Sequence, residues 1–260
     1  GYIGRHGERW HSQMTSSAVD RNAVMQVESF SNSTQLDYVL GRKGPWVRQI
    51  AFFKDQDPLG PTGFLMGDSH DAGANSAWRL WLTSQNISLS DHSALSVGED
   101  DVDLDIFFYR GNRLDLKTEH TVQKGKGRRG DKVGPVDLEQ TAVVARLKGQ
   151  GAITALLFPR LKTEPSPRVT WLADGQGVRI DSVFGTDYVF MAKPDRRRQQ
   201  LSLSHDRNGA EPVQMEINCA VCSVQVRNGT VKLALGTAGR IQFGDAFLEG
   251  DSTAMQTFMD

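Results

Sequence analysis

The 260-residue sequence predicts an all-β fold, a large antiparallel β-sandwich of the supersandwich kind with little or no helix. Apolar side chains recur at every second residue along most of the chain, which is the period of a strand and not of a helix. Turn-forming glycine, asparagine and aspartate residues separate these runs at short intervals. The content of 38% hydrophobic and 23% charged residues is ordinary for a chain that buries a core. Because all-β sandwiches reach this length as one unit, we expect residues 1–260 to form a single domain.

Seven segments carry the strand pattern most clearly, and they are 46–52, 78–82, 102–108, 152–158, 169–172, 186–191 and 231–235. Turn signals between the strands include Gly44-Pro45, Asp174-Gly175, Asn208-Gly209 and Asn228-Gly229. Residues 137–147 fit a helix or a strand, and their neighbours favour the strand. No long helix is expected, although the tail at 252–259 could form a single turn.

Two segments depart from the simple pattern. In 215–226 the apolar positions are odd as far as Val221 and even from Cys222 onward. A strand changes parity only by inserting a residue, so we expect a β-bulge at this point or, alternatively, two strands that meet at a bend. Residues 121–135 are rich in glycine and basic residues and poor in apolar ones. This composition predicts a long mobile loop.

The chain has two cysteines, Cys219 and Cys222, in a Cys-x-x-Cys spacing. A zinc ribbon needs a second pair of ligands, and a redox site needs the pair at the start of a helix. Neither condition is met, since the pair lies in a strand-like run. We therefore expect two buried core thiols.

The overall charge and the absence of long apolar runs narrow the choice of partners. A net charge of −1 gives no general attraction to nucleic acid or to acidic lipid. No apolar run is long enough to cross a bilayer. The sequence begins with Gly1 and not with methionine, so we expect a start that is processed, engineered or truncated, as in a piece of a larger protein.

The two histidines near the start are the best candidates for a metal site. His6 and His11 lie close together, with Glu8 between them, and could bind zinc or supply a general base. Their spacing matches no specific metal motif, and the alternative is a polar loop. The remaining catalytic residues are unknown.

Two basic tracts are the candidate substrate-binding residues, namely Arg128 with Arg129 and the run Arg196, Arg197 and Arg198. Such tracts could contact a polyanion, although basic loops are more commonly just solvated. Neither tract has interleaved aromatic residues, so nucleic-acid binding gains no support. Residues 67–71 (Gly-Asp-Ser-His-Asp) could form a polar site but fit a turn better.

Several segments resemble the C-terminal β-sandwich region of the heparinase II/III-like polysaccharide lyases. Gly1-Tyr2 is similar to the end of the family's Asp-x-Gly-Tyr stretch, and His6 and His11 fall where the family has a histidine. Residues 17–24 resemble the family's segment ending in His-Asn-Thr-Val, with Arg21 in place of that histidine. Further similar strands lie at 46–55, 64–68, 187–190 and 224–235.

The resemblance implies an upstream α/α-barrel in the parent chain, an acidic polysaccharide held in the cleft between the two parts, and cleavage by β-elimination. It implies that this chain forms one wall of that cleft, and that the tyrosine and histidine of the reaction come from the upstream part. It also implies a zinc ion, with upstream ligands and His6 or His11 as the last one. A secreted or periplasmic location follows from the same resemblance.

A second hypothesis belongs to another class. The chain could be a non-catalytic β-sandwich, either a carbohydrate-binding module or a structural scaffold. An upstream sequence with some three hundred residues of helical pattern would favour the lyase, as another large domain would have about that size.

Overall fold

The computed structural model describes residues 12–16, 24–57, 59–70, 76–84, 86–98, 100–111, 114–129, 132–147, 151–195, 198–207 and 210–259. Most of these residues are in strands, and the one helical element among them is the three-residue 3₁₀ turn η1 (Ala173–Gly175). All recorded strand pairs are antiparallel, within four sheets. The predicted all-β antiparallel fold is therefore confirmed.

The first two sheets are formed by strands between residues 12 and 161. Sheet A contains, in spatial order, β1 (Ser12–Ser16), β6 (Ser76–Leu82), β11 (Lys132–Leu147) and β10 (Leu114–Arg129). Sheet B contains β2 (Gln26–Asn32), β3 (Leu36–Lys43), β4 (Trp46–Phe53), β5 (Gly63–His70), β12 (Gly151–Leu161), β9 (Val102–Phe108), β8 (Ser93–Ser96) and β7 (Ile87–Leu89).

The other two sheets are formed by the second half. Sheet C contains β13 (Arg168–Leu172), β14 (Gly177–Ser182), β15 (Gly185–Met191), β18 (Val221–Arg227), β19 (Thr230–Leu235) and β22 (Met255–Met259). Sheet D contains β16 (Gln199–Arg207), β17 (Ala210–Cys219), β20 (Gly239–Phe243) and β21 (Ala246–Gly250).

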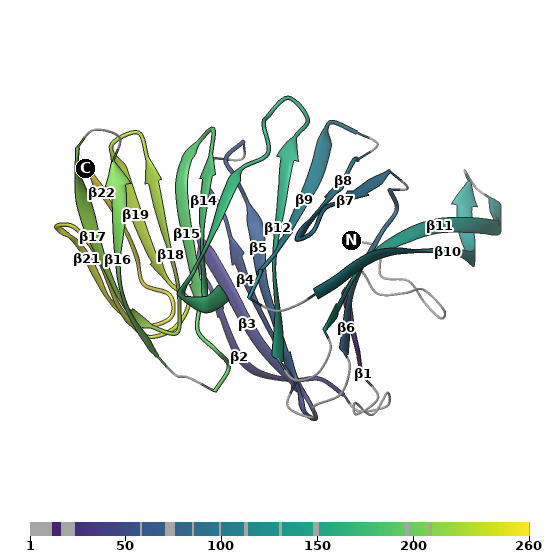
Figure 1. The fold of residues 1–260 in the computed structure, drawn as a ribbon, viewed down its shortest axis with the longest axis horizontal. Coiled ribbons are helices and arrows are strands. Elements are labelled where there is room, and N and C mark those ends of the chain that lie inside the picture. The colour runs from purple at the N-terminus through teal and green to yellow at the C-terminus, as the bar shows by residue number, and fades with distance from the viewer. Residues whose placement is uncertain are drawn as a thin grey trace.

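The four sheets stack in the order A, B, C and D, and Figure 1 shows them from right to left. Three apolar cores separate them. Trp78 and Val143 of sheet A pack against sheet B. The opposite face of sheet B packs on sheet C through residues such as Leu65 and Val189. Sheet C packs on sheet D through residues such as Ile217. Alternate side chains of the two middle sheets point into different cores, which explains why their strands are buried on both faces.

All seven strongly patterned segments are strands, and 137–147 lies within β11, which confirms the choice of strand there. The turn predicted at Asn228-Gly229 joins β18 to β19, with φ of 37° and 75° at its two residues. Positive φ at both positions is what a two-residue hairpin needs. The helical turn at 252–259 is wrong, since β22 occupies most of that segment and pairs with β19.

The mobile loop predicted at 121–135 is also wrong. The backbone continues as strand through β10 and β11, in unbroken register from the pair Leu114–Leu147 to the pair Arg129–Lys132. Only residues 130–131, at the tip, lie outside the described part. The loop was predicted because the segment has few apolar residues. A strand pair is joined by backbone hydrogen bonds, which do not require apolar side chains, so low apolar content does not exclude a strand.

The change of parity at Val221 and Cys222 marks a crossing between two sheets and not a bulge. Strand β17 ends in sheet D at Cys219, and β18 begins in sheet C at Val221. The amides of Ala220 and Val221 both donate to Oγ1 of Thr237, at 3.0 Å each, which fixes the bend. The bulge is therefore wrong, and the alternative of two strands meeting at a bend is confirmed.

Cys219 and Cys222 are buried free thiols in the core between sheets C and D, as predicted. Burial, together with the neighbouring Cys219, raises the pKa of the Cys222 thiol well above its ordinary value. A thiol in this environment stays protonated and is a poor nucleophile or metal ligand.

Candidate functional site

Most of the site residues predicted from sequence lie where the structure does not describe side chains. His6, His11, Arg196 and Arg197 are outside the described residues. Arg128 and Arg129 are described by their backbone at the end of β10, and Arg198 is exposed just before β16. The roles given to these residues stay predictions.

Neither metal ligands nor a membrane span are found in the described residues. Within those ranges, no group of three or more histidine, cysteine, aspartate and glutamate side chains could hold a metal ion. The predicted zinc site depends on His6 and His11, so it stays a prediction. None of the helices found in the same ranges is long and apolar enough to cross a bilayer.

Asp68, from the predicted turn at 67–71, lies inside strand β5 and joins it to β4. The turn is therefore wrong for residues 67–70, and Asp71 lies outside the described residues. The Asp68 carboxylate is buried and accepts hydrogen bonds from Nε1 of Trp46 (2.7 Å) and from Nε (2.7 Å) and Nη2 (2.9 Å) of Arg48. A carboxylate held by three donors joins two strands firmly and has little capacity left for a ligand.

A second buried pair lies between sheets B and C. Nη2 of Arg227 on β18 donates to both carboxylate oxygens of Asp187 on β15, at 2.5 and 2.6 Å. Asp55, which follows β4, lies 3.8 Å from Nε of Arg227 and 3.7 Å from Nζ of Lys232. Burial raises the pKa of Asp187 to about 6, although the charge and hydrogen bonds of Arg227 lower it. This group of charges ties a loop of sheet B to the centre of sheet C.

Sequence reasoning missed a cluster of charges on the outer face of sheet A. Side chains alternate between the two faces of a strand, and Trp78 and Leu80 face sheet B, so Arg79 lies on the opposite face. Arg79 on β6 and Lys117 on β10 are both in register with Val144 of β11, and Glu119 follows two residues after Lys117.

Three cations converge on the carboxylate of Glu119. Nε of Arg79 lies 3.1 Å from one oxygen, and Nζ of Lys117 and Nη2 of Arg146 lie 2.9 and 3.2 Å from the other. The side chains of Lys117 and Arg146 are 42% and 45% exposed, whereas that of Arg79 is 15% exposed. We call these four residues the Glu119 cluster. Lys117 and Arg146 present much of their surface to solvent.

The Glu119 cluster keeps an excess of positive charge. Partial burial would raise the pKa of Glu119, but the hydrogen bonds from Lys117, Arg79 and Arg146 and the charge of Arg79 lower it to about 2. Glu119 is therefore ionised at all ordinary pH values and balances one of three cations. Asp115, in register with Arg146, is exposed on the same face.

The backbone of β10 continues from the Glu119 cluster toward Arg129, through a stretch with Lys124, Lys126, Arg128 and Arg129. The opposite strand begins at Lys132. Figure 1 shows this hairpin extending away from the stacked sheets. The sequence signal that could have found the cluster is the spacing of Lys117 and Glu119, two residues apart in a segment with strand period.

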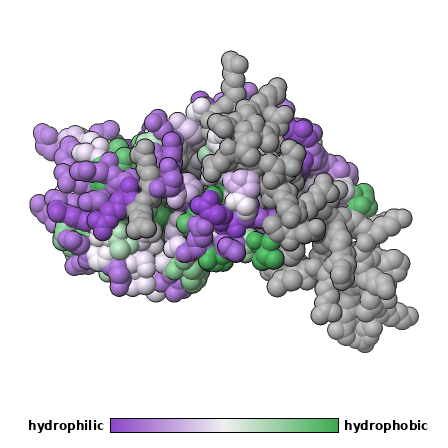
Figure 2. Space-filling view, turned by 90° about the horizontal axis from the view of Figure 1, so that it is seen from below, coloured by the Kyte–Doolittle hydropathy of each residue, from purple (hydrophilic) through white to green (hydrophobic). Residues whose placement is uncertain are grey.

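The surface gives little sign of a large apolar platform. Figure 2 shows the molecule from below, and the coloured residues are mostly hydrophilic, with hydrophobic ones in small separate patches. Scattered apolar residues of this kind are normal on a protein surface. On this view, charge rather than apolar area distinguishes the described surface.

No family model and no curated protein matches the chain. Similar solved structures include heparan sulfate lyase HepC from Pedobacter heparinus, with 12% identity and a TM-score of 0.46, over 68% of this chain and 29% of that one. A mutant of the same HepC has 13% identity and a TM-score of 0.44, over 80% and 30%. The heparinase III BT4657 gene product has 8% identity and a TM-score of 0.44, over 67% and 29%.

These structures are heparan sulfate lyases and a heparinase, the class of protein named by the sequence resemblance. This chain spans about 30% of their length. Because every TM-score is below 0.5, function has to be inferred from the chain's own residues.

Proposed function

We propose that the chain is the β-sandwich domain of a lyase that cleaves uronate-containing polysaccharide by β-elimination, and that the outer face of sheet A forms one wall of the substrate cleft. The observation that carries this proposal is the Glu119 cluster, in which three cations share one carboxylate and two of the cations, Lys117 and Arg146, are more than 40% exposed beside a buried apolar patch of the same face. Exposed cations such as Lys117 and Arg146 attract a polyanion, and the attraction weakens as the salt concentration rises.

The arrangement of the other charged residues supports a wall rather than a complete catalytic site. Arg48, Asp68 and Asp187, which lie in the segments that resemble the lyases, are engaged in buried ion pairs. β-Elimination needs a base within hydrogen-bond reach of the acidic carbon and a donor that stabilises the uronate carboxylate. We propose that the base comes from the upstream part of the parent, as the resemblance implies, and that this chain supplies binding.

Binding of the chain to heparan sulfate tests the proposal directly. In Lys117→Gln/Arg146→Gln, we expect affinity to fall about five- to tenfold, because two exposed ion pairs contribute about 0.5 kcal/mol or more each. The matched control is Arg168→Gln/Arg240→Gln, which removes the same charge from sheets C and D. Equal losses in both variants would show attraction to net charge alone and would remove the cluster from the binding surface.

Activity of the full-length parent tests the chemistry. Incubation with uronate polysaccharides should release unsaturated oligosaccharides. If the parent releases none from any uronate polymer while the chain still binds glycan, the chain is a carbohydrate-binding module instead.

Zinc content of the parent tests the metal proposal, in which His11 or His6 is the last ligand. His11→Ala should lower the bound zinc per molecule. The control is His92→Ala, in the turn between β7 and β8 of sheet B, which should leave the bound zinc unchanged. Unchanged zinc in both variants would exclude His11 as a ligand.

A further inference from the structure

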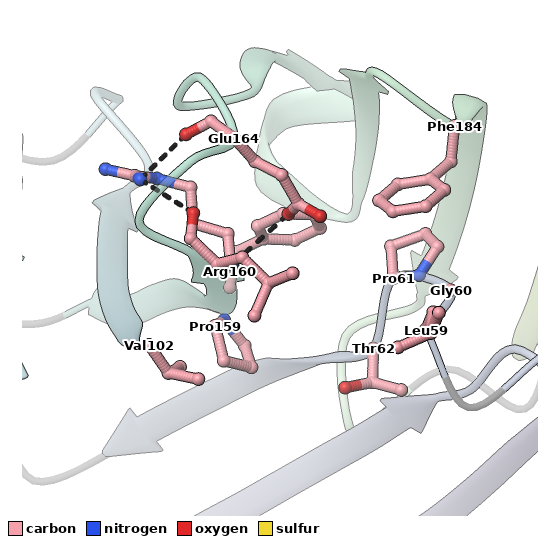
Figure 3. Close-up of a pocket in the computed structure, with 11 residues that line it drawn as sticks. Leu59, Gly60, Pro61, Thr62, Val102, Pro159, Arg160, Glu164 and Phe184 are labelled. Atoms are coloured by element: carbon pink, nitrogen blue, oxygen red, sulfur yellow. Dashed lines mark hydrogen bonds between the residues drawn. The ribbon is translucent and has the colours of Figure 1, made fainter. Parts of the chain in front are cut away.

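A small pocket lies where one end of sheet B meets the turn between β14 and β15 of sheet C. Its volume is about 150 Å³. Figure 3 shows Leu59, Pro61 and Thr62 from the loop before β5 on one side, and Arg160 with Glu164 on another. Phe184, from the turn of sheet C, forms a further wall. The pocket is therefore built by two sheets that belong to different halves of the chain.

The two charged side chains of the pocket are already engaged within the protein. Nε of Arg160 donates to Asp105 at 2.7 Å, and Nη1 donates to the carbonyl oxygens of Leu161 and Glu164 at 3.2 and 2.8 Å. Its Nη2 lies 3.6 Å from Asp103. The Glu164 carboxylate accepts from the amide of Leu161 at 3.2 Å. A sugar would have to break these bonds to be recognised, and breaking them costs more than it returns.

The walls and rim are apolar. Leu59 and Val102 line the pocket and are 72% and 46% exposed. Leu161, which also lines it, is 39% exposed, and Val183, next to Phe184, is 60% exposed. Single exposed apolar residues need no explanation, but three in the lining of one pocket form a surface of the kind that contacts another protein.

Hydrogen bonds within the two loops hold the walls of the pocket in shape. The amide of Leu59 donates to the Asp57 carboxylate at 2.9 Å, and the amide of Gly60 donates to the carbonyl oxygen of Asp57 at 2.9 Å. The amide of Phe184 donates to Oγ of Ser182 at 3.2 Å. A preformed pocket lowers the entropic cost of binding.

Three exposed aspartates lie within two residues of apolar residues that line the pocket, and Glu164 lines it. Asp57 precedes Leu59 by two residues, and Asp100 and Asp101 immediately precede Val102, and all three are exposed. Arg160 is balanced by Asp103 and Asp105, whereas Lys162, whose Nζ donates to the carbonyl oxygen of Gly98 at 2.7 Å, keeps its positive charge and is outnumbered by the three exposed aspartates. The surroundings of the pocket are therefore negative, which favours a basic partner.

We propose that this pocket docks one apolar side chain of a basic protein segment. The volume suits a single aliphatic or aromatic side chain, since sites for drug-sized ligands measure about 300–1,000 Å³. The apolar lining supplies the anchor, and the acidic rim selects the flanking residues. The site lies away from sheet A and does not depend on the proposed polysaccharide binding.

Blocked pentapeptides test this with the whole chain, by changes in backbone amide NMR shifts. Lys-Lys-Leu-Lys-Lys should shift the amides of Leu59, Val102, Leu161 and Phe184. Lys-Lys-Ser-Lys-Lys should bind at least about tenfold more weakly, because burial of a leucine contributes roughly 1.5 kcal/mol or more. Glu-Glu-Leu-Glu-Glu should not bind. Equal binding of the serine and leucine peptides, or shifts confined to another surface, would overturn the proposal.

Two variants and a control locate the anchor. Leu59→Ser, at an exposed position, should weaken the leucine peptide about fivefold or more, and Met259→Ser, at a residue 87% exposed on β22, should leave its affinity unchanged. Asp100→Lys/Asp101→Lys should weaken both lysine peptides. If Leu59→Ser binds the leucine peptide as tightly as the unaltered chain does, and its NMR spectrum shows an intact fold, the pocket is not the docking site.

Discussion

The buried pair of Asp187 with Arg227 and the exposed Glu119 cluster contain the same kinds of charged groups in different surroundings. Asp187 is 1% exposed in its side chain and Arg227 is 12% exposed, between sheets B and C. In the Glu119 cluster, two of the three cations are more than 40% exposed. A buried charge without its partner is strongly destabilising, whereas an exposed ion pair contributes little to stability. The comparison indicates that the Asp187–Arg227 pair holds sheets B and C together, whereas the exposed cations of the Glu119 cluster can be reached from solvent.

The largest expected effect is that of Asp187→Ala, which leaves Arg227 without its bidentate partner in the interface. We expect the free energy of unfolding to fall by about 3–5 kcal/mol. Equilibrium unfolding in urea measures it. The matched control is Asp181→Ala, at a carboxylate 20% exposed that also pairs with two arginines, and it should cost about 1 kcal/mol or less. Similar losses in the two variants would contradict the distinction between buried and exposed pairs.

The pH dependence of stability should differ in sign between the two regions. The folded-state pKa of Asp187, about 6, lies above its ordinary value of 3.8. The folded chain thus binds this proton more tightly than the unfolded chain, so its contribution to stability decreases as pH rises through that interval. Glu119 has a folded-state pKa of about 2, below its ordinary 4.5, so its contribution is present above pH 4.5 and is lost as pH falls toward 2.

Unfolding midpoints measured across these two intervals check both signs. Asp187→Asn should lose the pH dependence of stability between pH 3.8 and about pH 6. Glu119→Gln should lose only the pH dependence at lower pH. An unchanged profile in Asp187→Asn would mean that Asp187 does not titrate differently in the folded chain.

The smallest effect on stability is expected for Glu119→Gln, about 1 kcal/mol or less, because the group is partly exposed. Its effect on binding should have the opposite direction from that of the cation variants. Removal of the shared carboxylate releases the two exposed cations, Lys117 and Arg146, from their ion pairs with Glu119, so affinity for heparan sulfate should rise about two- to fivefold. Calorimetric titration checks this, and weaker binding would mean that Glu119 orients the cations for the ligand.

The strands could be predicted from sequence because their alternation is local, as in 46–52 and 231–235. Which strand pairs with which depends on distant residues, and the local alternation carries no information about it. The hairpin at 121–135 has no apolar alternation, and only its pairing across β10 and β11 makes it strand. At Val221, the sequence showed a change of parity but not that the chain moves from sheet D to sheet C.

The functional residues were harder to predict for the same reason. The Glu119 cluster combines Arg79 and Arg146 with residues 117–119, which only the register of sheet A brings together. Asp68 looked like part of a polar turn, and burial in strand β5 gave it a structural role. The composition of residues 124–132 identified a basic segment, but it did not show that this segment belongs to the strands β10 and β11.

The salt dependence of heparan sulfate binding tests the central claim most directly. Each exposed cation that contacts the polyanion releases counter-ions, so the logarithm of the affinity falls linearly with the logarithm of the salt concentration. We predict a clearly shallower slope for Lys117→Gln/Arg146→Gln than for the unaltered chain, and a slope close to the unaltered one for Arg168→Gln/Arg240→Gln. Equal slopes for all three proteins would contradict the proposal that sheet A faces the polysaccharide.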